Sequence, residues 1–346
     1  MISIMLKEVF YRIVHALIRV EFLIYYALSL TLLLKKGMST YYVAYTLLIA
    51  VICDNLSVYT HEFGHLLLGK VSGFELFDFR IPFFSAQKRN SGWDIHSNKE
   101  RQHRCYMKSK ESHLFTEKAV LYYLGGSLCN FITAVLALAF FKKHFLIFGG
   151  IIIYELSVGI QNIIPNLKRN YNDGTVIRLL VTDRYNGELL RRQMDILSDI
   201  LLSKTLSEIE CIDENIEVEK ENDLSFFLRM MKVYLELERG DAIRAEIQIG
   251  DIAANICDYS IDMQNRFLCE KLFIYSLNKS HETEKIYEEY MATKPRKDLY
   301  YYISILCYET MICKNREREA GLKKILERSI NGEEDDTILR LKLRML

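Results

Sequence analysis

Four long apolar stretches in the first half of the chain constrain its fold more than any other feature. They are Ile13–Leu34, Tyr41–Gly69, Ala119–Phe141 and Phe145–Asn166. Each is long enough for the roughly 20 helical residues that cross the hydrocarbon core of a bilayer. Charged residues gather in the second half instead, so the pattern predicts a membrane part followed by a soluble part.

The stretches predict a mainly α protein with three regions. Residues 1–40 would form an N-terminal transmembrane helix and residues 41–180 a membrane core, together a polytopic bundle of about four spans. Residues 181–346 would form a soluble α-helical domain. A formal net charge of +0 gives no reason to expect a nucleic-acid partner, and the 8 cysteines include no CxxC pair that would indicate a cysteine zinc site.

A basic loop, residues 70–118, lies between the second and third stretches and sets the expected orientation. The positive-inside rule places this loop, and with it both termini, in the cytoplasm. Four lysines on the short outer connections oppose this assignment but are outnumbered. Charged residues interrupt the first apolar stretch, so we expect no cleavable signal peptide. The sequence therefore predicts a multi-pass integral membrane protein surrounded by the lipid bilayer, in a prokaryotic cell membrane. The basic residues of the loop include Lys88, Arg89, Lys99, Arg101, Arg104, Lys108 and Lys110.

Apolar and polar residues alternate within the basic loop, with Phe77, Phe79, Ile81 and Phe83 on one face. This period of two predicts a small β element at the membrane surface, and Pro82 predicts that its strand lies at a sheet edge. Such an edge could pair with an extended substrate by β-augmentation. A plain membrane-surface hairpin explains the pattern equally well.

The second half of the chain has apolar residues at helical spacing and a weak internal repeat. Similar segments begin at Tyr234, Tyr275 and Tyr308, which predicts recurring helical pairs of roughly tetratricopeptide length. A small solenoid that binds a peptide or protein partner would follow from such pairs, and a plain helical bundle is the alternative.

The segment HEFGH, His61 to His65, carries the chemistry of the chain. On a helix, two histidines four residues apart project from one face and can share one tetrahedral metal ion. Glu62 follows His61 and can take a proton from an attacking water, as in the HExxH pattern of zinc peptidases. A pair of satisfied core histidines is the alternative, but polar groups in an apolar span are costly without a shared cation.

Zinc needs a third protein ligand, and Asp173 in the segment NIIPNLKRNYNDG is the candidate. Three motifs in this order resemble the site-2 protease family of intramembrane zinc metalloproteases. They are HEFGH in a spanning stretch, GGSLCN at residues 125–130, and NIIP followed by DG. The resemblance covers roughly residues 41–180. It implies that His61, His65 and Asp173 bind zinc and that Glu62 is the catalytic base.

The family resemblance also implies that Asn130 and Asn162 hold the substrate or the developing oxyanion. An asparagine in a span equally often joins helices by hydrogen bonds. The chain departs from the family pattern at Ser127, where proline is usual, and in a longer gap between Pro165 and Asp173. If that gap keeps Asp173 from the metal, Asn166, Asp183 or a cytoplasmic group would have to replace it.

Asp54 lies seven residues before His61 and therefore on the same helical face. It is a candidate for supporting a zinc ligand by a hydrogen bond, and lining a water path or pairing with another span are the alternatives.

These features predict an intramembrane zinc metalloendopeptidase that cleaves a membrane protein or peptide precursor in or near its transmembrane segment. The main rival is a catalytically inactive, membrane-anchored interaction protein that works through its helical repeats, in immunity or peptide transport. A soluble peptidase with packed apolar helices is a second rival, against which the four long stretches argue.

Overall fold

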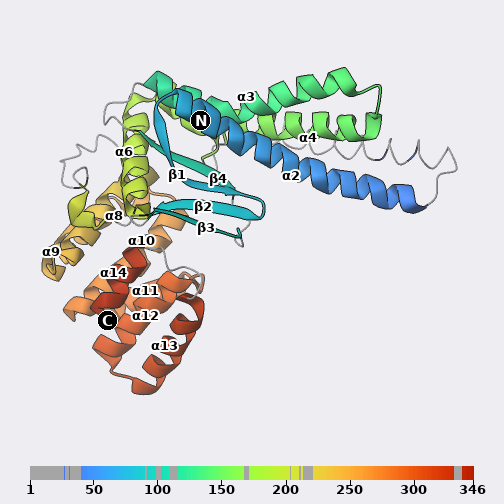
Figure 1. Cartoon of the computed structure of the whole chain (residues 1–346). Coiled ribbons are helices and arrows are strands. Elements are labelled where there is room, and N and C mark those ends of the chain that lie inside the picture. Colours follow the sequence, from blue (N-terminus) through green and yellow to red (C-terminus); the bar gives the residue numbers. More distant parts are fainter. Residues whose placement is uncertain are drawn as a thin grey trace. The chain divides into compact units, whose positions relative to one another are not determined.

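The computed structural model describes residues 27, 31, 40–89, 92–98, 103–109, 116–166, 171–202, 204–209, 212, 221–330 and 337–346 (Figure 1). The chain divides into two compact units, Met1–Glu188 and Leu189–Leu346. The predicted division at residue 180 lies close to this boundary, which falls within helix α6 (Arg184–Leu201). The predicted first span, Ile13–Leu34, lies outside the described residues apart from two positions.

The expectation of a mainly α protein with a small β element is confirmed. The described residues form twelve α-helices and one four-stranded antiparallel sheet. Among these helices, two are long and apolar enough to cross a membrane, with candidate spans Glu117–Phe140 and Phe145–Ile163. The predicted stretch Tyr41–Gly69 forms one continuous helix that also carries the HEFGH segment.

Three helices pack on one another in the first unit: α2 (Thr40–Val71), α3 (Thr116–Phe140) and α4 (Phe145–Ile163). The backbones of α2 and α3 touch where two glycines meet, because a Cβ atom on Gly64 would lie 2.2 Å from the carbonyl oxygen of Gly125. Small residues allow such close approach between membrane helices. α4 ends where Ile164 takes the extended conformation required by the following Pro165.

The sheet lies between α2 and α3 in the sequence, and its strand order is β3-β2-β1-β4. The strands are β1 (Phe74–Ile81), β2 (Phe84–Arg89), β3 (Gly92–His96) and β4 (Arg104–Ser109). Buried Phe74, Cys105 and Met107 pack against Tyr122 of α3, which fixes the sheet to the helices beside HEFGH.

The prediction that the strand around Phe77 to Phe83 lies at a sheet edge is wrong. β1 pairs with β2 on one side and with β4 on the other. The strand ends at Ile81, and Pro82 lies in the turn to β2, where Phe83 has φ = 67°. A proline in the turn needs no ladder hydrogen bond, so it places no limit on the position of the strand. The two edges belong to β3 and β4.

From Asn222 onward, the second unit forms successive helical pairs followed by a last helix. The first helices of three pairs follow the N-cap residues Asn222, Ser260 and Asp298, at a constant interval of 38 residues. The interval confirms the predicted recurrence of helical pairs. The spacing is more regular between the N-cap residues than between the similar segments that begin at Tyr234, Tyr275 and Tyr308, because the first helices of the pairs differ in length. The helices are α8 (Asp223–Glu238), α9 (Ala242–Ala253), α10 (Ile261–Asn278), α11 (Thr283–Ala292), α12 (Leu299–Tyr308), α13 (Arg316–Ile330) and α14 (Thr337–Met345).

Candidate metal centre

Three side chains from distant parts of the first unit meet at one point. His61 and His65 project from the same face of α2, with their Nε2 atoms 3.1 Å apart. The Oδ2 atom of Asp173, the first residue of α5 (Asp173–Thr182), lies 3.1 Å from each of these nitrogens. The sequence predicted all three as metal ligands, and the structure brings them together as a group that could hold a metal ion.

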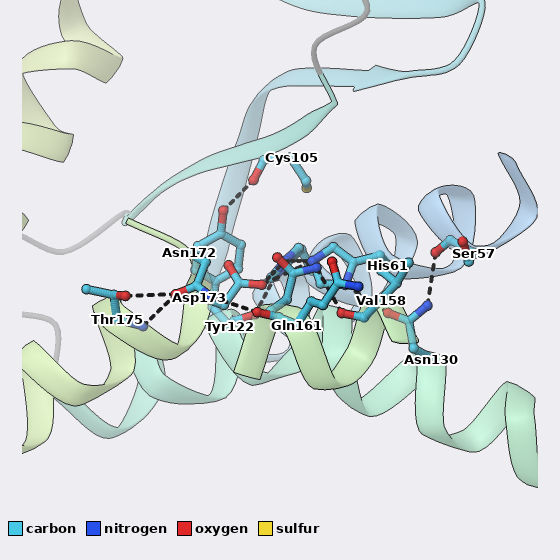
Figure 2. Close-up of polar contacts among 12 residues, drawn as sticks. Ser57, His61, Cys105, Tyr122, Asn130, Val158, Gln161, Asn172, Asp173 and Thr175 are labelled. Atoms are coloured by element: carbon cyan, nitrogen blue, oxygen red, sulfur yellow. Dashed lines mark hydrogen bonds and ion pairs between the residues drawn. The ribbon is translucent and has the colours of Figure 1, made fainter. Parts of the chain in front are cut away.

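The proton positions on the two histidines follow from their other hydrogen bonds (Figure 2). The amide nitrogen of Asn130 donates to the Ser57 carbonyl oxygen and to the Glu155 carboxylate, so both of its hydrogens are used. Its Oδ1 atom therefore accepts from Nδ1 of His61, at 2.8 Å. A ring that donates from Nδ1 presents a bare lone pair at Nε2 when it is neutral.

His65 has the same arrangement, because its Nδ1 atom donates to the backbone carbonyl oxygen of Tyr122 at 2.9 Å. Two imidazole nitrogens and one carboxylate oxygen thus face one another at equal distances. One proton can bridge only two of these three atoms, whereas a metal ion can bind all three. The donor set therefore fits a cation.

Zinc suits this donor set better than magnesium or calcium, which prefer oxygen ligands. Zinc–nitrogen bonds of about 2.0 Å imply about 3.3 Å between neighbouring ligand atoms of a tetrahedron. The observed separations of 3.1 Å agree with that value. Two histidines and one carboxylate leave a fourth position for water or substrate, as in catalytic zinc sites.

Glu62 lies in the same buried environment as the ligands. Its side chain is 7% exposed, and it is close enough to His61, His65 and Asp173 for electrostatic interaction with each. The helix thus carries its candidate base next to its candidate ligands, as the HExxH spacing predicted.

Asp173 reaches the histidines because Asn172 joins the two ends of the preceding loop. The amide of Asn172 donates to the carbonyl oxygens of Gln161 and Ile164 at the end of α4, both at 2.7 Å. Its Oδ1 atom accepts from the backbone nitrogens of Asn166 and Thr175. The longer gap after Pro165 therefore does not keep Asp173 from the site.

Gly174 allows the close contact between α4 and α5. A Cβ atom at this position would lie 2.0 Å from the carbonyl oxygen of Ile163. Steric exclusion of a side chain thus explains why glycine follows Asp173 in the sequence. The absence of its side chain lets the N-terminus of α5 rest directly on the end of α4.

Asp173 is ionised in this setting. Burial raises the pKa of its carboxyl group, but the adjacent side chains of His65 and His61 lower it by more, and the pKa falls to about 2. The group is therefore a carboxylate at neutral pH, which is the form that binds a metal.

Gly126 makes room for the two imidazole rings. A Cβ atom on this residue would lie 2.5 Å from Cε1 of His61 and 2.6 Å from Nε2 of His65. The two glycines of the GGSLCN segment thus have separate functions: Gly125 lets the helices approach, and Gly126 leaves space for the ligands.

The remaining predicted residues lie elsewhere. The amide of Asn162 donates to the carbonyl oxygen of Val158 within its own helix. Asp54 is exposed on α2, and the Nδ1 atoms it was expected to support are bonded to Asn130 and Tyr122. Asp183 caps α6 by accepting from the backbone nitrogen of Asn186 at 3.1 Å, away from the ligands.

Three residues that support the site were not predicted from the sequence. Glu155 of α4 is fully buried and accepts hydrogen bonds from Asn130 and from Thr60 of α2. Tyr122 and Asn172 act through the contacts described above. Glu155 had a signal, because a carboxylate inside an apolar span usually has a partner or a function. The sequence held no such signal for Tyr122, since its contact with His65 is made by its backbone carbonyl oxygen.

Comparisons with known proteins add no assignment. No protein-family model matches the chain, no curated protein matches it, and no solved structure matches it. The likeness to the site-2 protease family therefore rests on the motifs and their order along the chain.

Proposed function

We propose that the chain is a zinc metalloendopeptidase of the site-2 protease type, which hydrolyses peptide bonds in or near transmembrane segments of a membrane protein or peptide precursor. The observation that carries this proposal is the triangle of two imidazole Nε2 atoms and one carboxylate oxygen, all 3.1 Å apart, with Glu62 beside it.

Zinc bound by His61, His65 and Asp173 would supply Lewis-acid activation of water and of the scissile carbonyl group. Glu62 takes the proton from the attacking water and then gives it to the leaving amine, so that the carboxylate is regenerated in each cycle. Asn130 and Tyr122 hold the two imidazole rings in the tautomer that binds metal.

The location in a membrane is supported by the apolar surface of the helices. On α3, Leu128, Ile132 and Val135 are exposed, with Val135 64% accessible. Exposed apolar patches of this kind are rare on soluble monomers and match a lipid environment. We propose a multi-pass protein with both termini and the basic loop in the cytoplasm, to be tested by reporter fusions at each connection.

A substrate must be extended before its carbonyl groups can be attacked, because the hydrogen bonds of a helix shield them. A sheet edge can hold such a segment by β-augmentation. β4 is the edge nearest the centre, since the hydroxyl group of Tyr122 donates to the carbonyl oxygen of Cys105 on that strand. We therefore propose β4, in place of β1, as the strand that orders the substrate.

The proposal is tested with purified protein by measuring bound zinc and the cleavage of a model membrane substrate. The variant Glu62→Gln keeps the three ligands and should retain its zinc, yet cleavage should fall by at least about 100-fold because proton transfer is lost. Full activity in Glu62→Gln, or wild-type protein without zinc, would contradict the proposal. The latter result would favour the inactive interaction protein.

A further inference from the structure

The last helix of the second unit, α14, is attached to three other helices through one lysine. α14 packs against α8 and α12, and the side chain of Lys342 extends to α10, where it pairs with Glu270. Lys342 and Glu270 are both 0% exposed. Lysine is almost never fully buried unless it has a partner, so this arrangement requires a specific explanation.

Three aromatic rings surround the ammonium group of Lys342. The distances from Nζ to the ring centroids are 4.8 Å for Phe273, 5.1 Å for Tyr300 and 5.7 Å for Tyr234. All three lie within the range in which a cation is attracted to the face of an aromatic ring. We call these three residues and Glu270 the lysine cage.

The lysine cage draws on the first helix of each pair in the second unit. Tyr234 belongs to α8, Glu270 and Phe273 belong to α10, and Tyr300 belongs to α12. In helical repeat proteins the surface made by equivalent helices of successive repeats is the usual binding surface. The cage is thus built on equivalent helices of three successive pairs.

Glu270 gives the lysine cage its negative charge. Burial raises the pKa of its carboxyl group, but Lys342 and Arg266 lower it by more, so the pKa lies below its usual value. Nε of Arg266 lies 2.9 Å from Oε1 of Glu270, and its guanidinium group covers the ring of Tyr300 at 3.2 Å. The carboxylate therefore keeps one partner even when Lys342 is absent, which leaves the cage intact and open to another ammonium group.

A purely structural last helix would not need this lysine. Burying an ion pair costs desolvation, and apolar residues of similar volume often stabilise an interface as well or better. α14 has 9 residues and is too short to be helical by itself in water, so its order depends on docking. Among the side chains of α14 that the structure describes, Ile338, 6% exposed, and Lys342 one turn later are buried, whereas Arg344 is exposed.

We propose that the lysine cage is a recognition site for a short basic amphipathic helix, and that α14 is an internal ligand which a partner peptide displaces. The partner offers an apolar residue and, four positions later, a lysine. This inference concerns the second unit alone and does not depend on the proposed protease function.

Binding is tested with the full-length protein and a fluorescein-labelled peptide of residues 331–346, followed by fluorescence anisotropy. In the wild type, α14 occupies the cage and the peptide should bind weakly. In Lys342→Ala the internal ligand is weakened, and the peptide should bind at least about tenfold more tightly. Arg344→Ala removes an exposed positive charge from the same helix and should behave like the wild type.

A second peptide, with alanine at the position of Lys342, separates recognition from general adhesion. It should bind Lys342→Ala protein at least about tenfold more weakly than the original peptide does. If Lys342→Ala unfolds at a lower temperature, the original peptide should restore the melting temperature and the alanine peptide should not. Equal binding of both peptides, or no binding and no restoration, would show that α14 is only a structural cap and would overturn the proposal.

Discussion

Asn130 offers the sharpest test of how the metal centre is built, because the structure and the family resemblance give it different roles. Its amide holds Nδ1 of His61 and is itself fixed by Ser57 and Glu155. Under the family resemblance it would instead touch the substrate. The variant Asn130→Ala removes the acceptor that fixes the His61 tautomer and also deprives the Glu155 carboxylate of one donor.

The expected cost is that of losing one orienting partner of a metal ligand, about 10- to 100-fold in zinc affinity. This corresponds to about 1.4 to 2.7 kcal/mol of binding free energy. The side chain of Asn130 is 0% exposed, so no water can replace it without rearrangement. Zinc affinity is measured by competition with a chromophoric chelator in detergent, and the melting temperature of the metal-free protein is recorded alongside.

Asn162→Ala is the matched control, since among the described residues this amide donates to the Val158 carbonyl oxygen within its own helix turn. Its zinc affinity should stay within about threefold of the wild type. The reasoning is refuted if Asn130→Ala binds zinc as tightly as Asn162→Ala does. Unchanged zinc affinity with lost cleavage would assign Asn130 to the substrate.

Two further predictions concern the ligands and the space around them. Asp173→Ala should lose most of its zinc, whereas Asp183→Ala should keep its zinc and lose only about 1 kcal/mol of stability with its helix cap. Metal analysis of both purified proteins tests this prediction. If Asp173→Ala still binds zinc, another residue must be the third ligand. Gly126→Ala should sharply lower zinc content, because the new methyl group would lie 2.5 Å from the His61 ring. Gly250 of α9 provides the control, since a Cβ atom at this position meets nothing within 4 Å. Gly250→Ala should therefore keep its zinc and gain about 0.5 to 1 kcal/mol in helix stability, and equal zinc content in the two variants would contradict the steric reading.

The ligands could be predicted from the sequence, and the residues that orient them could not. The spacing of His61 and His65 defines a helical face from local geometry alone, and the acidic residue before Gly174 completed a known order of motifs. Asn130 and Glu155 belong to α3 and α4, and only the packing of those helices brings them to His61. Long-range contacts of this kind leave no periodic trace in one sequence.

The error at β1 has a similar origin. Pro82 was assigned to the strand because it continues the alternation of apolar residues, and a proline in a strand implies an edge. Alternation fixes the face of a residue but does not show where a strand ends. In the second unit, periodicity indicated the helical pairs, whereas the burial of Lys342 could not be predicted because its partners come from three other helices.

If the chain binds zinc as we propose, the order of the three candidate ligands also sets a time for metal binding during synthesis. His61 and Asp173 are separated by α3 and α4, and the first histidine takes its tautomer from α3. A ribosome-bound chain that has released only α2 would therefore have two unoriented histidines and no third candidate ligand. On the proposed function, zinc would be held only after α5 has emerged and Asn172 has closed the loop, so the nascent protein would stay inert until α2, α3, α4 and α5 have packed together.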